Sequence, residues 1–138
     1  MESLLRKIMP IAVYLLLNFL IIACGEDFDE TDDLAKLGEI RNEILLIVGE
    51  ASCSEQPECN YIGLGVKPCG GPWEYLIFSS VNTDTAELFI KVQEYNDWNK
   101  VVNKRYEYVS DCSMPEPPKL VCISDKCVDR STLTGEDP

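Results

Sequence analysis

Cysteine has the most distinctive chemistry in this chain of 138 residues, which holds seven cysteines and no histidine. Without histidine, neither a Ser-His-Asp triad nor a Cys-His pair can form. The cysteines include no Cys-x-x-Cys pair, so their spacing disfavours a zinc site. We therefore expect no metal and no cofactor. Six of the cysteines lie after residue 50, and an even number in an exported domain predicts three disulfides; they are Cys53, Cys59, Cys69, Cys112, Cys122 and Cys127.

Paired carboxylates are the remaining chemistry that could act on a substrate. The chain has 24 acidic residues against 12 basic ones, and its net charge is −12. Glu74 and Asp111 could form the two-carboxylate site of a glycan hydrolase if a disulfide between Cys69 and Cys112 brought them together. The alternative, which we favour, is that both carboxylates belong to a solvated acidic surface. We therefore expect no enzyme activity.

The turn between the first two predicted strands is one candidate binding element. It contains Gly70 and Gly71 close to Trp73, and two glycines would let a partner's backbone or a sugar ring approach the tryptophan closely. The alternative is a strained turn that leads into a core strand, with Trp73 packed inside. On the residues alone, this alternative is the stronger interpretation.

Residues 113–119 are the other candidate binding element, with Met114 and Glu116 as the contacts. The segment lies between two cysteines and is stiffened by prolines, as in small disulfide-rich inhibitors that hold an extended segment toward a protease. The alternative is a plain connection that passes the edge of the sheet, and the residues alone favour it.

The N-terminal residues indicate where the protein is placed. Two basic residues precede an apolar run over residues 8–23, which is too short and too interrupted for a typical membrane-spanning helix. The run ends in IIAC, which resembles the lipobox of bacterial lipoproteins. The resemblance implies that residues 1–23 are a signal peptide that is removed. It also implies that Cys24 is acylated and attaches the chain to a lipid bilayer. The alternative is a plain N-terminal anchor helix.

Residues 24–33 continue from this cysteine as an acidic stretch without a basic residue, which predicts an extended, disordered tether. Its position resembles the surface-export signal of lipoproteins in the Bacteroidetes lineage, although a solvated spacer explains it equally well. We expect a lipid-anchored location in the bacterial cell envelope, on the periplasmic or surface face of the outer membrane. The acidic balance also argues against a nucleic-acid partner.

The rest of the chain predicts a single α+β domain over residues 34–130 and a polar tail over 131–138. Apolar residues at helical spacing predict two helices, and runs of β-branched and aromatic residues predict four strands. The order α-β-β-α-β-β predicts a small antiparallel sheet packed with two helices. Asp32 or Asp33 is expected to cap the first helix, and Asp84 the second. The helices are predicted over 34–47 and 82–103, and the strands over 60–66, 73–79, 120–123 and 126–128.

Six cysteines allow 15 pairings, among which local ones are the simplest. We expect Ser124 and Asp125 to form a two-residue turn that sets Cys122 directly opposite Cys127, within disulfide range. The predicted bridges are therefore Cys53–Cys59, Cys69–Cys112 and Cys122–Cys127.

Three pieces of the chain resemble a widespread set of small exported bacterial proteins. They are the Cys53–Cys59 loop with the Ile-Gly-Leu-Gly that follows it, the Lys-Pro-Cys-Gly-Gly-Pro turn over residues 67–72, and the Ser-Asp-Cys at 110–112 with the segment 117–127. The resemblance covers residues 51–127, and Cys-Gly-Gly-Pro is its most specific part. It supports the domain boundaries, but this family has no established activity that could be transferred.

Together these features favour a non-enzymatic envelope lipoprotein that binds a macromolecule, possible targets being a protease or a cell-wall hydrolase. An acidic inhibitor of a basic wall hydrolase would fit the charge, because opposite fields speed encounter. The alternatives are a carboxylate-based glycan hydrolase and a glycan-binding module that uses Trp73.

Overall fold

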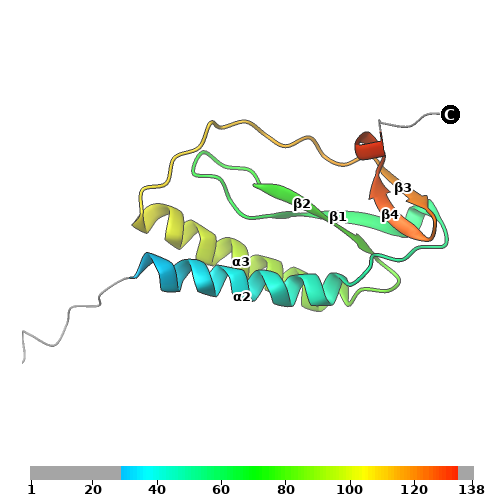
Figure 1. Cartoon of the computed structure of the whole chain (residues 1–138), viewed down its shortest axis with the longest axis horizontal. Coiled ribbons are helices and arrows are strands. Elements are labelled where there is room, and N and C mark those ends of the chain that lie inside the picture. Colours follow the sequence, from blue (N-terminus) through cyan, green and yellow to red (C-terminus); the bar gives the residue numbers. More distant parts are fainter. Residues whose placement is uncertain (1–28, 134–138) are drawn as a thin grey trace, which may run out of the picture.

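The computed structural model describes residues 29–133 and has the predicted order α-β-β-α-β-β, which confirms the α+β class (Figure 1). Two short 3-10 helices, η1 and η2, accompany the main elements. The elements are α2 (Glu30–Val48), η1 (Gln56–Glu58), β1 (Cys59–Leu64), β2 (Glu74–Ser79), α3 (Thr85–Arg105), β3 (Leu120–Ile123), β4 (Lys126–Asp129) and η2 (Arg130–Leu133).

Helix α2 begins four residues before its predicted start, so the prediction of an extended tether is wrong for residues 30–33. The cap is Asp29 and neither of the two predicted aspartates; its side chain accepts a hydrogen bond from the Thr31 amide at 2.8 Å. The early start is explained by contacts with α3, because Tyr106 and Arg105 both bind the Asp33 carboxylate in the first turn of α2. Tertiary contacts thus order a stretch whose composition alone predicts disorder.

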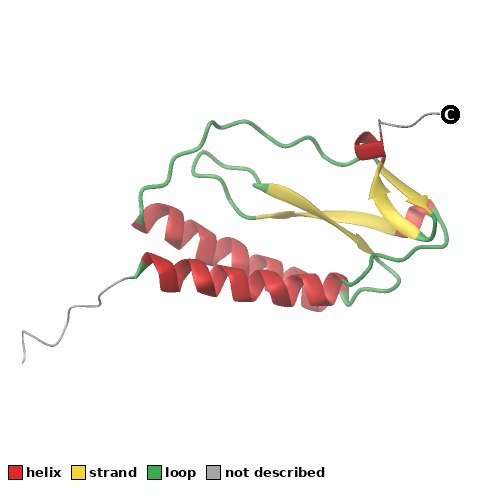
Figure 2. Cartoon of the chain, viewed as in Figure 1, coloured by secondary structure: helices red, strands yellow, loops and turns green. Residues whose placement is uncertain are grey.

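Helix α3 begins at Thr85, three residues after its predicted start, but its predicted cap is confirmed. The Asp84 side chain caps it by accepting a hydrogen bond from the Glu87 amide at 3.0 Å. The two helices pack together on one face of the β1–β2 hairpin (Figure 2). The apolar residues at helical spacing form the main core between them and the sheet. The buried members of this core are Ile40, Ile44, Val48, Leu64, Leu76, Phe78, Leu88 and Val92.

The four strands form two separate antiparallel hairpins, β1–β2 and β3–β4, rather than one continuous sheet. Cys59 is opposite Ser79 in the first hairpin, and Cys122 is opposite Cys127 in the second. The predicted turn of the second hairpin is confirmed, because Ser124 and Asp125 have φ values of 50° and 60°, as a two-residue turn of the primed type requires.

The three disulfides are present, but only the Cys69–Cys112 pairing was predicted correctly. The other two bridges are Cys53–Cys122 and Cys59–Cys127, with Cα–Cα distances of 6.1 and 5.4 Å. The segment that includes Ala51 runs antiparallel to β4, and the Cys127 amide donates to the Ala51 carbonyl at 2.9 Å. This pairing brings the hairpin's two cysteines to Cys53 and Cys59, so the bridges tie the two hairpins together instead of closing local loops.

The expected signal peptide (1–23), Cys24, tether residues 25–28 and tail residues 134–138 lie outside the described residues. Within residues 29–133, no helix has the length and apolar character needed to cross a membrane.

Candidate functional site

The candidate site is built around the loop over residues 65–73, which joins β1 to β2 and which we call the β1–β2 loop. Three asparagines on α3 fix the start of this loop. Asn96 Oδ1 accepts from the Gly65 amide at 2.7 Å, and Asn99 Oδ1 accepts from the Val66 amide at 2.8 Å. Asn103 Nδ2 donates to the Val66 carbonyl at 2.6 Å. Because these side chains replace the partners that the loop backbone lacks, the loop is held against the helix without strand pairing.

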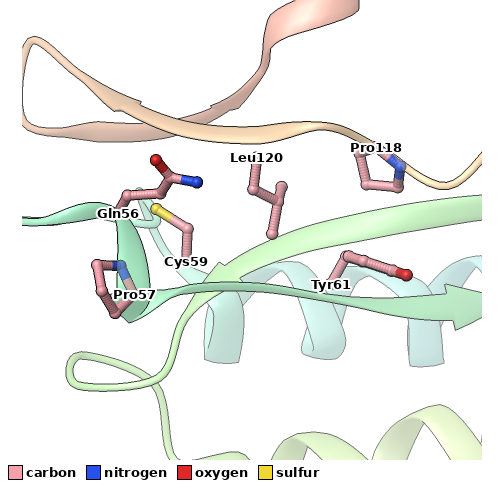
Figure 3. A pocket seen from close by; sticks show the side chains of 6 residues that line it. All are labelled: Gln56, Pro57, Cys59, Tyr61, Pro118 and Leu120. Carbon is pink, nitrogen blue, oxygen red and sulfur yellow. The ribbon is translucent and has the colours of Figure 1, made fainter.

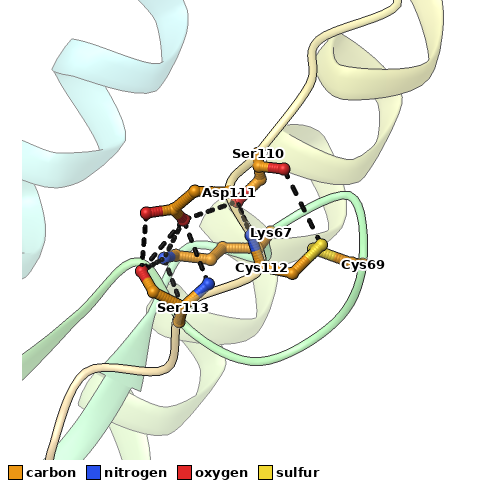
Figure 4. A network of polar contacts seen from close by, with 6 residues as sticks. All are labelled: Lys67, Cys69, Ser110, Asp111, Cys112 and Ser113. Carbon is orange, nitrogen blue, oxygen red and sulfur yellow. Dashed lines mark hydrogen bonds and ion pairs between the residues drawn. A yellow bond between two sulfur atoms is a disulfide. The ribbon is translucent and has the colours of Figure 1, made fainter.

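Lys67 joins the β1–β2 loop to the chain that follows α3 (Figure 4). Its side chain is only 7% exposed, and its Nζ donates to the Ser113 carbonyl at 2.5 Å and to Ser113 Oγ at 3.3 Å. Asp111 completes the contact with an Nζ–Oδ1 distance of 3.5 Å. Hydrogen bonds from the Ser113 hydroxyl and amide, and then the charge of Lys67, lower the pKa of Asp111 below its ordinary value. Asp111 is therefore an ionised partner for the buried ammonium group.

The Cys69–Cys112 disulfide is the second link at this place, and it brings the two candidate binding elements together. Gly71 has a φ of 80°, and a Cβ on it would overlap the side chain of Met114. The absence of a side chain at Gly71 is thus what allows Met114 to pack onto the turn. Gly70, with a φ of 93°, faces open space.

Trp73 lies beside this junction at the surface, and not in the core as the alternative interpretation expected. Its side chain is 42% exposed, and the Lys67 Nζ lies 5.0 Å from its ring centroid. The ring packs against Gly65, where an added Cβ would come within 2.6 Å of Trp73 Cδ1. One part of the indole is therefore fixed by the loop and another part is open to solvent.

Residues 113–119, which we call the strap, cross the side of the first hairpin that the helices leave open (Figures 1 and 2). The strap has no helix or strand, and Met114, 58% exposed, and Glu116 project from it as exposed residues. At its start, Ser113 is held by Lys67 and the adjacent disulfide. At its end, the Lys119 amide donates to Asp129 Oδ1 at 2.9 Å, and the Lys119 carbonyl accepts from the Arg130 amide at 2.9 Å. The strap is therefore an exposed segment with both ends fixed.

A groove of about 450 Å³ separates the far end of the strap from β1 (Figure 3). Tyr61 is 43% exposed there, and its ring contacts Tyr75 edge-on at a centroid distance of 5.1 Å. Apolar and aromatic walls with one amide suit an apolar side chain or the face of a sugar. The groove is lined by Gln56, Pro57, Cys59, Tyr61, Pro118 and Leu120.

The two carboxylates of the hydrolase alternative have different cationic partners. Glu74 pairs with Arg41 at 2.8 Å, whereas Asp111 pairs with Lys67. A glycosidase also needs one carboxylic acid whose pKa is raised so that it can donate a proton. The pKa of Asp111 is instead lowered, which does not suit a general acid.

The sulfur atoms of Cys53, Cys59 and Cys127 lie within 4.8 Å of one another, which is close enough for a metal ion. They are bonded in the two disulfides, and a bridged sulfur is not a thiolate ligand. This cluster therefore belongs to the covalent framework of the fold.

Sequence reasoning missed the three asparagines and Lys67 as residues that build the site. Asn96, Asn99 and Asn103 fall at spacings of three and four, so they share one face of α3. Asparagine is unfavourable inside helices because its amide competes for backbone groups. A helical row of three could therefore have been taken as a sign that a neighbouring backbone segment binds there.

Fold and site define a small disulfide-bonded α+β protein that holds an exposed proline-rich segment at both ends. Comparison with known proteins finds no matching family model, no matching curated protein and no matching solved structure. The resemblances to lipoproteins and to the Cys-Gly-Gly-Pro proteins therefore stay predictions.

Proposed function

We propose that this chain is a non-enzymatic lipoprotein of the bacterial cell envelope that binds a macromolecular partner through the strap. The observation that carries the proposal is the strap itself, with exposed Met114 and Glu116 between two fixed ends. No part of the proposal requires a catalytic group.

Preorganisation is the physical reason for this function. A flexible segment loses conformational entropy when it binds, whereas a segment already fixed at its ends loses less and binds more tightly. Lys67 and the Cys69–Cys112 bridge fix one end of the strap, and β3 and β4 fix the other. Three prolines inside it, Pro115, Pro117 and Pro118, restrict the backbone between these ends further. A plain connection would not need fixing at both ends.

The chemistry of the strap favours a partner with an apolar pocket and a basic rim. Met114 is a flexible apolar side chain that can fill such a pocket, and Glu116 can pair with a basic group beside it. The chain's net charge of −12 would also attract a basic protein over a longer range. A cell-wall hydrolase or a protease with a basic surface meets both conditions, and the bound strap would then inhibit it.

Anchoring through acylated Cys24 would limit the reach of the domain. Five residues separate Cys24 from the first residue of α2 at Glu30, and the six steps between their Cα atoms span at most about 22 Å. The start of α2 would therefore stay near the bilayer, on the outer membrane in our proposal, and partners would be met there. Metabolic labelling with an alkyne fatty acid tests the anchor: the label should be incorporated by the natural chain and lost in Cys24→Ala.

Affinity capture tests the binding function. The full chain, purified in detergent with its disulfides formed, is immobilised and exposed to solubilised bacterial envelope and secreted proteins. A partner that engages the strap should be retained by the natural chain and lost from Met114→Ala/Glu116→Gln. The matched control is Leu46→Ala/Glu39→Gln, which likewise truncates one exposed apolar side chain and neutralises one exposed glutamate, both on α2.

The strap proposal predicts that only the strap variant loses the partner, and that added salt weakens retention. Equal retention by both variants would contradict it, as would loss of the partner from both. Inhibition is checked separately, by whether the captured enzyme loses activity when the natural chain is added.

A glycan-binding module is the second candidate, because Tyr61 lies half exposed in the groove and Trp73 lies half exposed beside the junction. Aromatic faces of this kind can stack on sugar rings. Oligosaccharides from cell-wall glycan should then change the tryptophan fluorescence of the natural chain, and Trp73→Leu should remove the change. Trp98, which is on α3 beneath Lys36, serves as the internal control because Trp98→Leu should keep the response.

A further inference from the structure

A second pocket lies on the side of the β1–β2 loop that faces α3. Its volume is about 250 Å³. It is distinct from the groove beneath the strap, with which it shares no lining residue. The pocket is lined by Val66, Lys67, Pro68, Lys100, Asn103 and Lys104.

Asn103 forms part of the wall of this pocket and ties it to the β1–β2 loop. The residue is 8% exposed, and its Nδ2 donates to the Val66 carbonyl at 2.6 Å. This bond fixes the orientation of the amide, because a flipped amide would set two oxygen atoms against each other. The buried Oδ1 then has no hydrogen-bond partner among the described residues. This oxygen lies beneath the accessible surface, so Asn103 fixes the wall of the pocket and does not offer an acceptor to a ligand.

Two lysines give the same pocket a positive charge. Lys100 and Lys104 are one helical turn apart on α3, an arrangement in which like charges repel. Lys100 pairs with the exposed Asp97 at 2.8 Å, whereas Lys104 has no ion pair with any residue in the range 29–133. The ammonium group of Lys67 is already used by Ser113, so this residue contributes its stem. An uncompensated positive charge is notable in a chain with twice as many acidic as basic residues.

We propose that this pocket binds a small anion. Lys100 and Lys104 would hold its negative charge. The volume suits a ligand about the size of a monosaccharide acid, or an inorganic phosphate with water. The inference does not depend on the strap, since it uses other residues and another face of the loop.

Titrations followed by ¹⁵N–¹H correlation spectra test the proposal on the full oxidised chain in detergent. The probes are glucuronate, inorganic phosphate and glucose, which resembles glucuronate in size but has no charge. The reporters are the backbone amide of Val66 and the side-chain amide of Asn103. At least one anion should shift both signals saturably with a dissociation constant on the order of 1 mM, and glucose should not. Saturation by glucuronate alone would assign a sugar acid, and saturation by phosphate alone would assign a phosphate.

Variants show whether the lysines hold the charge. Lys100→Gln/Lys104→Gln should weaken anion binding by roughly tenfold, which corresponds to two exposed charge contacts. Lys119→Gln/Lys126→Gln removes the same charge elsewhere on the surface and should change binding less than about twofold. The proposal is overturned if neither anion gives a saturable shift up to roughly 50 mM. It is also overturned if glucose binds as well as the anions, or if the two double variants weaken binding equally.

Discussion

Removing cysteines in matched and mismatched pairs should reveal how the two bridges between the hairpins share their stabilisation. The matched variant Cys53→Ala/Cys122→Ala removes one bridge and leaves the other intact. The mismatched variant Cys53→Ala/Cys59→Ala removes one cysteine from each bridge and therefore breaks both. If the bridges were the local ones, Cys53–Cys59 and Cys122–Cys127, the mismatched variant would be the milder of the two.

The expected magnitudes follow from the chain segments that each bridge closes. While Cys59–Cys127 is intact, Cys53–Cys122 closes only a ring of about 11 residues, worth about 2.8 kcal/mol of chain entropy. Once Cys59–Cys127 is lost, Cys53–Cys122 closes a path of about 26 residues through Cys69–Cys112, worth about 3.5 kcal/mol. The matched variant should thus lose about 3 kcal/mol of unfolding free energy and the mismatched variant about 6 kcal/mol. The second loss is comparable with the whole stability of many small domains.

Urea unfolding, followed by tryptophan fluorescence under non-reducing conditions, measures both losses. Thiol titration of the unfolded variants is the control: after residue 50, the matched variant should have no free thiol, whereas the mismatched one frees Cys122 and Cys127. These two lie opposite each other in the hairpin and can form a new local bridge, which would return about 2 kcal/mol. The reasoning is refuted if the mismatched variant is as stable as the matched one while its thiols stay free.

Three further changes test the site and the helix pair. Gly65→Ala should destabilise the fold by about 1–3 kcal/mol and alter tryptophan emission, because the new Cβ meets Trp73 at a φ of 75°. Gly38→Ala, with open space around its Cβ in α2, should instead stabilise the fold by about 0.5–1 kcal/mol; urea unfolding measures both changes. Lys67→Met removes the charged donor to Ser113 and should lower the unfolding free energy by about 1.5–3 kcal/mol, with faster amide hydrogen exchange in the strap. Unchanged exchange would show that Lys67 does not fix the strap. Hydrogen bonds from Tyr106 and Arg105 lower the pKa of Asp33 in the folded state, so the ionised carboxylate stabilises the fold above pH 3.8, and this stabilisation is lost as the pH falls through the folded-state pKa. In acid titrations, the difference in unfolding free energy between the natural chain and Asp33→Asn should therefore disappear in that range of pH. A difference that stays constant with pH would count against the pairing.

Features that depend on a few neighbouring residues were predictable from the sequence. The turn at Ser124 and Asp125 was one, because a two-residue hairpin needs positive φ values that short polar residues tolerate. The cap at Asp84 was another, since its carboxylate reaches an amide only three residues away. The same local rules predicted the α+β order, because the spacing of apolar residues differs between helix and strand.

The pairing of cysteines was not predictable in this way. The register that sets Cys122 opposite Cys127 was correct, yet both sulfurs bond to cysteines about 70 residues away. What decides the pairing is the antiparallel contact between the Ala51 segment and β4, which has no signature in either segment. The short spacing of Cys122 and Cys127 therefore favoured a bridge between them, whereas in the folded chain each is bonded to a cysteine near the Ala51 segment. The early start of α2 has the same origin, since the residues that hold Asp33 lie at the C-terminal end of α3.

The candidate site combines features that neighbouring residues set with contacts between segments that are remote in sequence. Its exposed parts, Met114 and Trp73, were visible as a proline-rich segment and a glycine-rich turn, and the correctly predicted Cys69–Cys112 bridge implied that they lie close together. The side chains that fix this arrangement were not predicted. Lys67 and the asparagines of α3 join them, and each acts on backbone atoms of a segment remote in sequence. The start of the strap is therefore positioned by helix α3 through the β1–β2 loop. It follows that changes on the buried asparagine face of α3 should alter partner binding even though they do not touch the partner.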